Sequence, residues 1–548
     1  MSPFLTTSDA SVLTPPPGGA PAPSTDANST ACFPAWWPLV FAANVLVWTV
    51  ASWLYRANLD PAGDMLENYA WGMEWQAGYH KHPPLFAWIT AAWFSVFPRG
   101  DFSYFALAAT NAAVGLLGIV ALGRRYLTPT LAIVAGLAMA VTPPYGSLAI
   151  KFNANTVLLS LWPWTAYFFV RYMQSGERRA ALGLGILAAL SMLAKYYSAV
   201  LLLTLLLAAC VRPAWRRRLA DARIGWAIAV AVALLAPHVL WMINNGMPTL
   251  QYVDHRMQEI AQPMRAVFTA LLSYTGVQFV YLIPALVFLA LLVNGARARA
   301  ALKMLRGLAT PGAAADLWWL AAGHLFVTIA VSLLSGAIIS SQWGRMAWFS
   351  VAPLWLIALQ AAGFAIAPRR ALTLLIAYWC LILALSPALG YRDAVEGTRT
   401  ARMPRAELAQ AAQAMWRSRY DTPLAIVTGS EKEARAVAFY GPGRTRVWDL
   451  HQPDHTPWLT AADLAREGAL VVCPAADLRC RRAAAALTAA PGALVSVHKR
   501  VWSIDQPAQS YWLYFVSPGA QDALAQPSTQ PAPAALPGVG PRAAAQQR

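Results

Sequence analysis

Charged residues are scarce in this sequence: Asp, Glu, Lys and Arg make up 12% of its 548 residues, against about 25% in soluble globular proteins. Only five residues are cysteine, which excludes a secreted scaffold held together by disulfides. A chain with so little charge cannot cover a water-exposed surface, so a cytosolic enzyme and a disordered scaffold are excluded as well. Hydrophobic residues instead reach 58%, with 24 tryptophans. Because tryptophan gathers at bilayer interfaces, the composition indicates a membrane protein.

The two ends of the chain differ from the rest. Residues 1–35 contain no Lys or Arg and are rich in Pro, Ser and Thr, a composition typical of a disordered tail, which we place in the cytoplasm. Without a basic segment before an apolar stretch, no cleavable signal peptide is predicted. Residues 519–548, rich in Ala, Pro and Gln, are predicted to form a second disordered tail.

Long apolar runs recur between these tails. A bilayer core requires about 20 residues of helix, and on this criterion we predict about eleven transmembrane helices within residues 36–391. They are expected near residues 36–55, 103–122, 127–145, 154–171, 180–195, 197–211, 224–242, 268–292, 316–338, 345–366 and 371–390. The two runs on either side of Lys195 also fit one long helix.

The basic residues are unevenly distributed between the predicted loops. If the N-terminus is cytoplasmic, the cytoplasmic loops carry 16 Lys and Arg, and the opposite face of the membrane part carries 8. This asymmetry follows the positive-inside rule. The net charge of +17 therefore reflects topology, and no nucleic-acid partner is expected.

An odd number of spans places the C-terminal region on the outer side of the membrane. Residues 392–518 alternate helical patterns with strand patterns such as PLAIVTGS and ALVVCP, which predicts a small exported α/β domain. Cys473 and Cys480 share this compartment. The sequence is compatible with a disulfide between them and with two free thiols.

The first outer loop, residues 56–102, is unusually polar for this sequence. It concentrates Asp60, Asp64, Glu67, Glu74, His80, Lys81 and His82. Asp64 and Glu67 lie three residues apart, hence on one face of a helix. Such a carboxylate pair beside Lys and His can perform acid–base chemistry and hold an anionic leaving group; the alternative is a set of solvated loop charges. The apolar run 85–97 is too short to span and predicts an interfacial helix.

Further polar groups are expected at the same outer level of the membrane. They are Lys151, Lys195, Tyr196, His238, Arg256 and Arg345. An ionisable residue within apolar sequence is a candidate functional residue, although snorkelling or interfacial anchoring explains a single lysine or arginine equally well. As a set, a ring of cations facing a carboxylate loop suits a lipid-linked phosphate.

No cofactor is predicted. The segment GSEKEA (429–434) lacks the spacing of a phosphate loop, and no Cys/His set has the spacing of a structural zinc site. His80 and His82 are not expected to bind a metal. The sequence identifies no metal ligands, and it does not decide whether the protein uses a divalent metal.

The first outer loop resembles that of GT-C superfamily glycosyltransferases, which use polyprenyl-phosphate sugars. Family members carry an outer loop of the form Asp-(Glu)-x-x-Tyr followed by Gly-Tyr-x-x-(His/Lys)-Pro-Pro-Leu-x-x-Trp. Here these are Asp64 to Tyr69 and Gly78 to Trp88. The similarity, to relatives of protein mannosyltransferases and of the lipid A aminoarabinose transferase, covers about residues 36–391. It includes the Lys195-Tyr196 step and the segment 340–344.

The resemblance implies a polytopic α-helical GT-C fold with an outward active site in a bacterial inner membrane. Asp64 would be the catalytic carboxylate, assisted by Glu67 or Asp60, because Met65 replaces the second acid of the motif. The donor would be an undecaprenyl-phosphate sugar and the acceptor lipid A or other lipopolysaccharide. The residues that compete to bind the donor phosphate or the substrate are Lys81, His82, Lys151, Lys195, Tyr196, Arg256 and Arg345.

Two other functions are compatible with the same pattern. A protein O-mannosyltransferase-like enzyme would use the same donor class and a protein hydroxyl as acceptor. A transporter or flippase of lipid-linked sugars predicts symmetrically placed broken helices, and the two halves of this sequence show no such symmetry.

Overall fold

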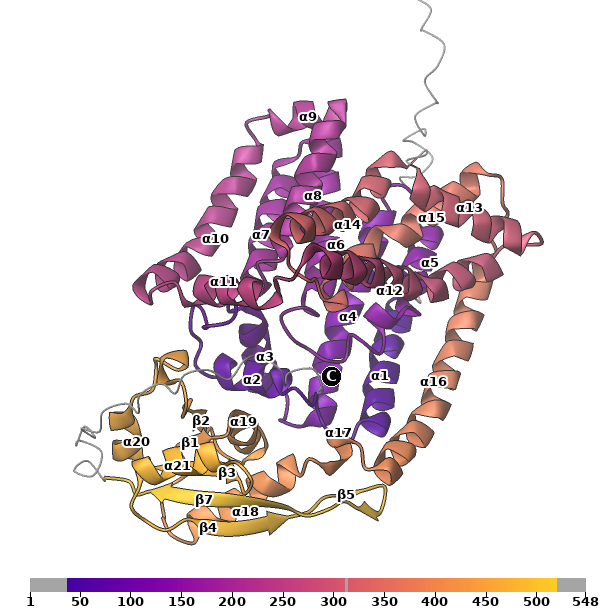
Figure 1. The fold of residues 1–548 in the computed structure, drawn as a ribbon. Helices are drawn as coiled ribbons and strands as arrows, with labels where there is room; N and C mark the ends of the chain where they lie inside the picture. Colours follow the sequence, from indigo (N-terminus) through magenta and orange to yellow (C-terminus); the bar gives the residue numbers. More distant parts are fainter. Residues whose placement is uncertain (1–36, 311–313, 520–548) are drawn as a thin grey trace, which may run out of the picture.

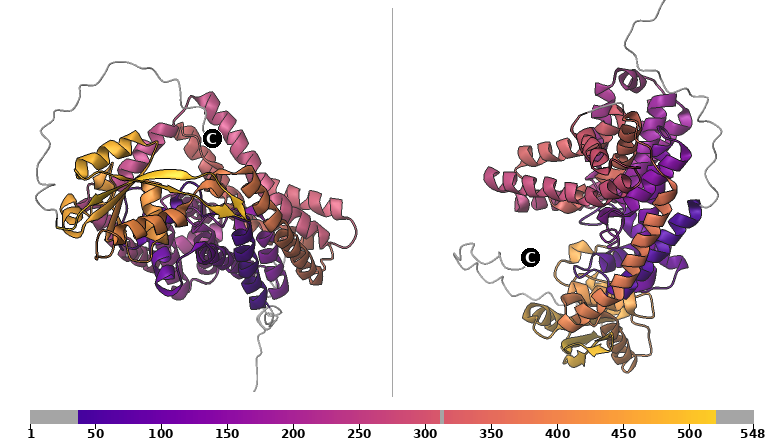
Figure 2. Two further views of the ribbon diagram at one scale, coloured as in Figure 1. Left: turned by 90° about the horizontal axis from the view of Figure 1, so that it is seen from below. Right: turned by 90° about the vertical axis from the view of Figure 1, so that its right-hand side faces the viewer.

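The computed structural model describes residues 37–310 and 314–519. The first predicted tail lies outside the described residues, and so do residues 520–548 of the second. The chain forms two parts: a large helical bundle and a smaller α/β domain stacked against one end of it (Figure 1). Figure 2 shows the same stacking from two further directions.

Most helices of the bundle are apolar around most of their circumference, as expected for elements surrounded by lipid and by each other. Its neighbouring pairs include α1 with α4, α4 with α6, α6 with α7, and α7 with α10. The helices are α1 (Trp37–Tyr55), α4 (Asp101–Gly123), α5 (Pro129–Ala140), α6 (Leu158–Ser175), α7 (Arg178–Ala194), α8 (Ser198–Val211), α9 (Pro213–Leu219), α10 (Ile224–Asn244), α11 (Pro248–Ile260), α12 (Met264–Leu291), α13 (Arg297–Ala309), α14 (Ala315–Ser335), α15 (Val351–Ala361) and α16 (Arg369–Glu396).

Six of these helices, α1, α4, α10, α12, α14 and α16, are long and apolar enough to cross a membrane, and the bent pair α8–α9 makes up to seven. The predicted runs 127–145, 154–171, 180–195 and 345–366 instead form helices of 12, 18, 17 and 11 residues, α5, α6, α7 and α15. Two of these runs include short 3₁₀ turns, Pro143–Tyr145 and Ala347–Ser350, which shorten the helix. Eleven spans therefore stays a prediction.

The chain breaks at Lys195, between α7 and α8, so the two runs around it form two helices. Lys195 itself adopts an extended conformation, with φ −164° and ψ 135°. This break places a lysine and two tyrosines at one end of the bundle, because the backbone leaves the helical path there.

The first outer loop folds into two short helices, α2 (Asp64–Gly72) and α3 (Leu85–Val96), at the end of the bundle (Figure 1). The predicted helix 85–97 corresponds to α3. The two helices approach closely at Gly72, where a Cβ would lie 2.3 Å from the carbonyl oxygen of Ala87. Only glycine permits this contact, which fixes α2 on the buried face of α3.

Residues 397–516 form the α/β domain. Its five-stranded sheet has the order β2-β1-β3-β7-β4, in which β1 runs parallel to β2 and β3 while β7 runs antiparallel to β3 and β4. The strands are β1 (Ile426–Gly429), β2 (Arg446–Val447), β3 (Ala469–Pro474), β4 (Ala493–Val497) and β7 (Gln509–Val516), with a separate pair β5 (Arg500–Val501) and β6 (Ile504–Asp505). The helices are α17 (Arg399–Arg402), α18 (Arg405–Arg417), α19 (Glu431–Tyr440), α20 (Ala461–Glu467) and α21 (Leu478–Leu487). Cys473 and Cys480 form a disulfide between β3 and α21.

Helix α19 fastens the α/β domain to the outer loop. Phe439 is fully buried and belongs to the apolar core of the bundle, where its ring meets Tyr69 and Tyr104. The hydroxyl of Tyr440 donates to Asp101 Oδ1 over 2.5 Å. The α2–α3 layer is thus enclosed between bundle and domain, with apolar contacts flanking its charged groups.

Candidate functional site

Asp60 organises the start of α2. One of its carboxylate oxygens accepts from the backbone N–H groups of Gly63 (2.9 Å) and Asp64 (3.0 Å), and the other from Met65 (2.9 Å). These groups belong to the first turn of the helix, which carries no internal partners. Asp60 is 1% exposed, so its role is to hold the backbone that presents Asp64.

Asp64 is the first residue of α2 and its side chain is 38% exposed. Its Oδ2 accepts from Lys151 Nζ (2.8 Å) and from Asn153 Nδ2 (3.0 Å). Lys151 also lies 3.4 Å from Asp60. Burial lowers the pKa of Lys151, but the two aspartates outweigh it and raise that pKa above its usual value. A permanently charged lysine therefore holds Asp64 as an accessible carboxylate in a fixed orientation.

Glu67, one turn further along α2, is buried between two cations. Lys81 Nζ lies 2.8 Å and Arg435 Nη2 2.9 Å from its Oε1. Burial raises the pKa of Glu67, but Arg435 and Lys81 together outweigh that effect and hold it below its usual range. Through Arg435, Glu67 joins the loop to the α/β domain. Because both cations stabilise its charged form, Glu67 is poorly suited to accept a proton.

Lys195 lacks a carboxylate partner among the described residues, unlike Lys81 and Lys151. Its Nζ donates to Asn155 Oδ1 and lies 5.0 Å from the ring centroid of Trp343. Among the described residues, no Asp or Glu oxygen lies within 4.0 Å of it. Its charge interacts with that of Asp64. Lys195 thus combines proximity to the exposed carboxylate with a charge that is free to pair with an anion.

Tyr196 turns away from Lys195 into a second network. Its hydroxyl lies 2.6 Å from His238 Nε2, and His238 Nδ1 lies 2.8 Å from the carbonyl oxygen of Ala77. Trp241 packs so closely on Gly78 that a Cβ there would lie 2.3 Å from its ring. This network fixes the outer loop against α10, which makes Tyr196 and His238 supports of the site.

The remaining predicted residues are His82, Arg256 and Arg345, of which His82 lies near the charges of Lys195, Glu67 and Asp64. His82 meets the rings of Phe86 and Tyr252, with centroids 5.7 and 6.0 Å away. Arg256 pairs with Glu259 at 2.7 Å. It lines a groove of about 890 Å³ between α11, α12 and the segment 338–341. Arg345 follows a 3₁₀ turn, and its Nε is buried without a hydrogen-bond partner among the described residues.

Within residues 37–310 and 314–519, no group of three or more His, Cys, Asp and Glu is arranged to hold a metal ion. The two histidines of the loop point to different neighbours. His80 stacks on His455 of the α/β domain with ring centroids 3.6 Å apart, whereas His82 lies among aromatic rings. The carboxylates nearest to the site already have lysine or arginine partners.

The stacked pair of His80 and His455 predicts a pH-dependent stability. Burial, and then the nearby His455, lower the pKa of His80 to about 2. Because the unfolded His80 has an ordinary pKa near 6.5, the unfolded state binds the extra proton, and the stabilising contribution present above pH 6.5 is lost as the pH falls. Because of His80, we expect the free energy of unfolding to fall by about 1 kcal/mol when the pH is lowered from 7.5 to 5.5.

Unfolding midpoints of the wild type and of His80→Phe at both pH values measure this effect. The variant keeps an aromatic ring against His455 and is expected to show a smaller drop on acidification. An equal drop in both proteins would contradict the assignment.

Sequence reasoning missed Arg435 and Arg405, which reach the loop from the α/β domain. Arg435 binds Glu67, and Arg405 Nη2 donates to the carbonyl oxygen of Asp60 over 3.0 Å. Both belong to ordinary helical patterns and carry no motif. Each lies more than 340 residues away in the sequence from the residue it contacts, so only the fold brings it to the start of α2.

Comparison with known proteins supplies independent evidence. Residues 81–241 match the family described as dolichyl-phosphate-mannose-protein mannosyltransferase. Over 174 residues the chain is 30% identical to the lipopolysaccharide core galacturonosyltransferase RgtA of Rhizobium johnstonii. That match covers 31% of this chain and 34% of the relative, about a third of each.

Two solved structures are similar at low sequence identity. ArnT from Cupriavidus metallidurans, bound to undecaprenyl phosphate, is 15% identical with a TM-score of 0.48, covering 88% of this chain and 98% of that one. The Archaeoglobus fulgidus oligosaccharyltransferase, in complex with Zn and sulfate, is 12% identical with a TM-score of 0.40, covering 74% and 62%.

Proposed function

Since the chain belongs to the GT-C superfamily of membrane glycosyltransferases, we propose that it transfers a sugar from undecaprenyl phosphate to lipid A or another lipopolysaccharide acceptor at the periplasmic face of the inner membrane. The observation that carries the proposal is Asp64, an accessible carboxylate fixed by Lys151 and Asn153 beside the unpaired cation Lys195. A carboxylate and a cation, side by side, match the two charges that develop in this reaction.

Asp64 serves the acceptor side of the reaction. When the acceptor is a hydroxyl, its oxygen attacks the anomeric carbon, Asp64 takes the proton, and the bond from that carbon to the phosphate oxygen breaks. When the acceptor is a phosphate oxyanion, no proton leaves, and Asp64 stabilises the positive charge of the oxocarbenium-like sugar. One displacement of this kind inverts the anomeric configuration.

Lys195 serves the leaving group. The electron pair of the broken bond departs with the polyprenyl phosphate, whose negative charge requires a cation that is not already neutralised. Lys151 and Lys81 are each paired with carboxylates, at 2.8 Å in both cases, which leaves Lys195 as the best placed. The groove beside Arg256 and Arg265, otherwise lined mostly by apolar side chains, is a suitable course for the lipid chain.

The positions of the basic helices favour this orientation. The arginine-rich α9 and α13 lie at the end of the bundle opposite to α2, α3 and the α/β domain (Figure 1). Positive charge gathers on the cytoplasmic side of membrane proteins, so the loop with Asp64 and the α/β domain belong to the periplasmic side.

Replacing Lys195 with alanine is expected to raise the KM for the lipid-linked donor about 10–100-fold, because a charge-assisted hydrogen bond to the phosphate contributes about 1.5–3 kcal/mol. The donor dependence of transfer in proteoliposomes measures this effect. Lys303→Ala, at an exposed lysine on α13, is the matched control. A donor KM that is unchanged in Lys195→Ala would remove Lys195 from the donor site.

The proposal as a whole is tested with the purified chain in proteoliposomes. Undecaprenyl-phosphate sugars are supplied as donors, lipopolysaccharide and protein as separate acceptors, and products are identified by mass spectrometry. We expect release of undecaprenyl phosphate and a sugar-sized mass increase on the lipopolysaccharide. Modification of the protein alone would support the second candidate, a protein O-mannosyltransferase-like enzyme, which the match of residues 81–241 favours. Absence of transfer to either acceptor would contradict both.

A further inference from the structure

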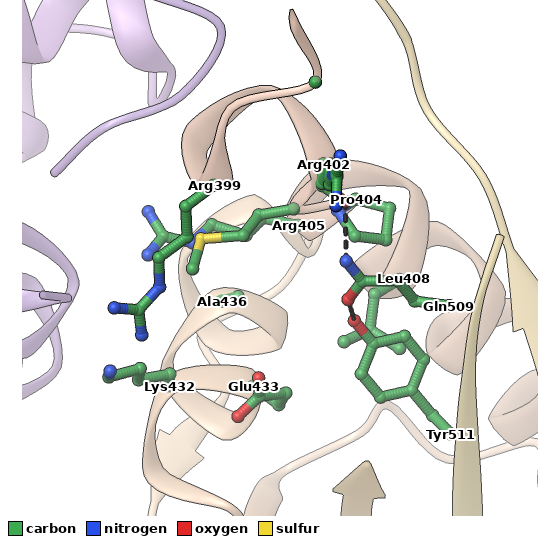
Figure 3. A pocket seen from close by; sticks show the side chains of 12 residues that line it. Arg399, Arg402, Pro404, Arg405, Leu408, Lys432, Glu433, Ala436, Gln509 and Tyr511 are labelled. Atoms are coloured by element: carbon green, nitrogen blue, oxygen red, sulfur yellow. Dashed lines mark hydrogen bonds between the residues drawn. The ribbon is translucent and has the colours of Figure 1, made fainter. Parts of the chain in front are cut away.

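The α/β domain contains a cavity of about 370 Å³ that the reaction described above does not use. Its walls come from α17, α18, α19 and β7, and Figure 3 shows the side chains that line it. The volume lies in the range of small-molecule sites, about 300–1,000 Å³. The charged lining residues are Arg399, Arg402, Arg405, Lys432 and Glu433.

These four cations are poorly neutralised. Among the described residues, none of them has an Asp or Glu oxygen within 4.0 Å, and Glu433 accepts a hydrogen bond from Ser430. Like charges that gather in a concave site repel each other and raise the local potential for anions. Such an arrangement is stabilised when an anion enters.

Arg405 gives the cavity a buried donor without a partner. The residue is 5% exposed, and its Nη2 donates to the carbonyl oxygen of Asp60. Its Nη1 is buried and has no hydrogen-bond partner among the described residues. A buried guanidinium nitrogen without an acceptor costs free energy, and an oxyanion in the cavity supplies the missing acceptor.

Neighbouring residues position Arg402 at the same cavity. A Cβ on Gly397, where φ is +58°, would lie 2.9 Å from Arg402 Nε, so the glycine provides the space for the guanidinium. Gln509 Nε2 donates to the carbonyl oxygen of Arg402 over 2.8 Å and fixes its backbone. In Figure 3, Arg399 and Lys432 extend to one side of the cavity.

The cavity adjoins the segment that carries the reactive carboxylate. A Cβ on Gly63, the residue before Asp64, would lie 3.5 Å from Lys432 Cγ. Arg405 binds Asp60, which in turn accepts from the backbone N–H of Asp64. A ligand in the cavity therefore lies against the segment that presents Asp64, on the side of the α/β domain and away from the membrane bundle.

We propose that this cavity binds an anionic sugar of the acceptor and so positions the acceptor for attack. The inference rests on the proposed glycosyl transfer. In the proposed reaction the donor phosphate pairs with Lys195 of the bundle, so an anion bound in the α/β domain belongs to the second substrate. Guanidinium groups bind phosphate and carboxylate oxygens in bidentate fashion, and both groups occur on acidic sugars.

Direct binding tests the cavity without reference to transfer. Isothermal titration of the full chain in nanodiscs uses glucose 1-phosphate, glucuronic acid and neutral glucose as probes. We expect at least one anionic probe to bind and glucose not to bind, and the two anionic arms distinguish phosphate from carboxylate recognition. The double variant Arg399→Gln/Arg402→Gln is expected to weaken that binding at least tenfold, because both side chains line the cavity.

Arg479→Gln, at an exposed arginine on α21 away from the cavity, is the matched control, and unfolding midpoints verify that both variants fold. Failure of both anionic probes to bind, or binding that is equal in the double variant, would overturn the proposal. Its acceptor role predicts a higher KM for acidic acceptor in the double variant with an unchanged KM for the donor. An unchanged acceptor KM would contradict that role, whereas absence of transfer in the wild type would contradict the proposed function and leave the binding result to decide the cavity.

Discussion

Asparagine in place of Asp64 is expected to lower the rate of sugar transfer by about 10²–10⁴-fold, the usual contribution of a positioned acid–base group. The substitution keeps the size of the side chain and its capacity to accept from Asn153. It removes the negative charge that takes the acceptor proton or stabilises the sugar cation. The Asp60 carboxylate still holds the first turn of α2, so the helix start is expected to remain in place.

Initial rates in proteoliposomes and unfolding midpoints separate the chemical effect from a loss of folding. Asp421→Asn, at an exposed aspartate of the α/β domain, is the matched control and is expected to retain full activity. Wild-type rates in Asp64→Asn would show that the carboxylate has no part in the reaction.

The second large effect is expected from Arg435→Met. Arg435 is 8% exposed and its guanidinium lies between Glu67 and Glu431, at 2.9 and 3.0 Å. Removing one partner of a buried ion pair leaves the other charge incompletely compensated, which costs about 3–5 kcal/mol. Lys81 still contacts Glu67 at 2.8 Å, so we expect a loss near 3 kcal/mol in unfolding free energy.

The expected consequence is a looser attachment of the α/β domain to the outer loop. Thermal unfolding in nanodiscs measures the loss of stability, and limited proteolysis between α16 and α18 reports on detachment of the domain. Arg479→Met, at an exposed arginine of the same domain, is expected to leave both readouts unchanged. Equal stability of Arg435→Met and the wild type would show that this ion pair does not join the two parts.

Features with a local cause could be predicted from the sequence. The helix α3 follows a pair of prolines that cannot continue an earlier helix. Lys195 interrupts an apolar run, although the sequence fitted two helices and one long helix equally well there. The concentration of charge in residues 56–102 stands out against a chain with 12% charged residues. These signals depend on neighbours in the chain and are visible without the fold.

Helix periodicity placed Asp64 and Glu67 on one face, and both do lie on α2. Their partners nevertheless differ, because Asp64 faces Lys151 of the bundle whereas Glu67 faces Arg435 of the α/β domain. Two side chains three residues apart on a helix do not point in the same direction. Since α2 lies between the bundle and the α/β domain, this difference decides which of the two each side chain contacts. The sequence contains no information on that junction.

The choice among cations likewise required three dimensions. Lys81, Lys195, Arg256 and Arg345 all precede or follow apolar runs and look equivalent along the chain. In the structure, Lys81 and Arg256 are paired with Glu67 and Glu259, so their charge is already compensated. Long-range pairing of this kind cannot be inferred from one sequence, and neither can the number of runs that form full-length spans.

The most direct test of the account is mass spectrometry of lipopolysaccharide from cells that lack the gene and carry either the wild-type chain or Asp64→Asn. We predict a sugar-sized mass loss in the cells without the gene, full restoration by the wild type, and no restoration by Asp64→Asn at equal amounts of membrane-inserted protein. Restoration by Asp64→Asn would contradict the assignment of this carboxylate, and lipopolysaccharide of identical mass in all strains would contradict the proposed acceptor.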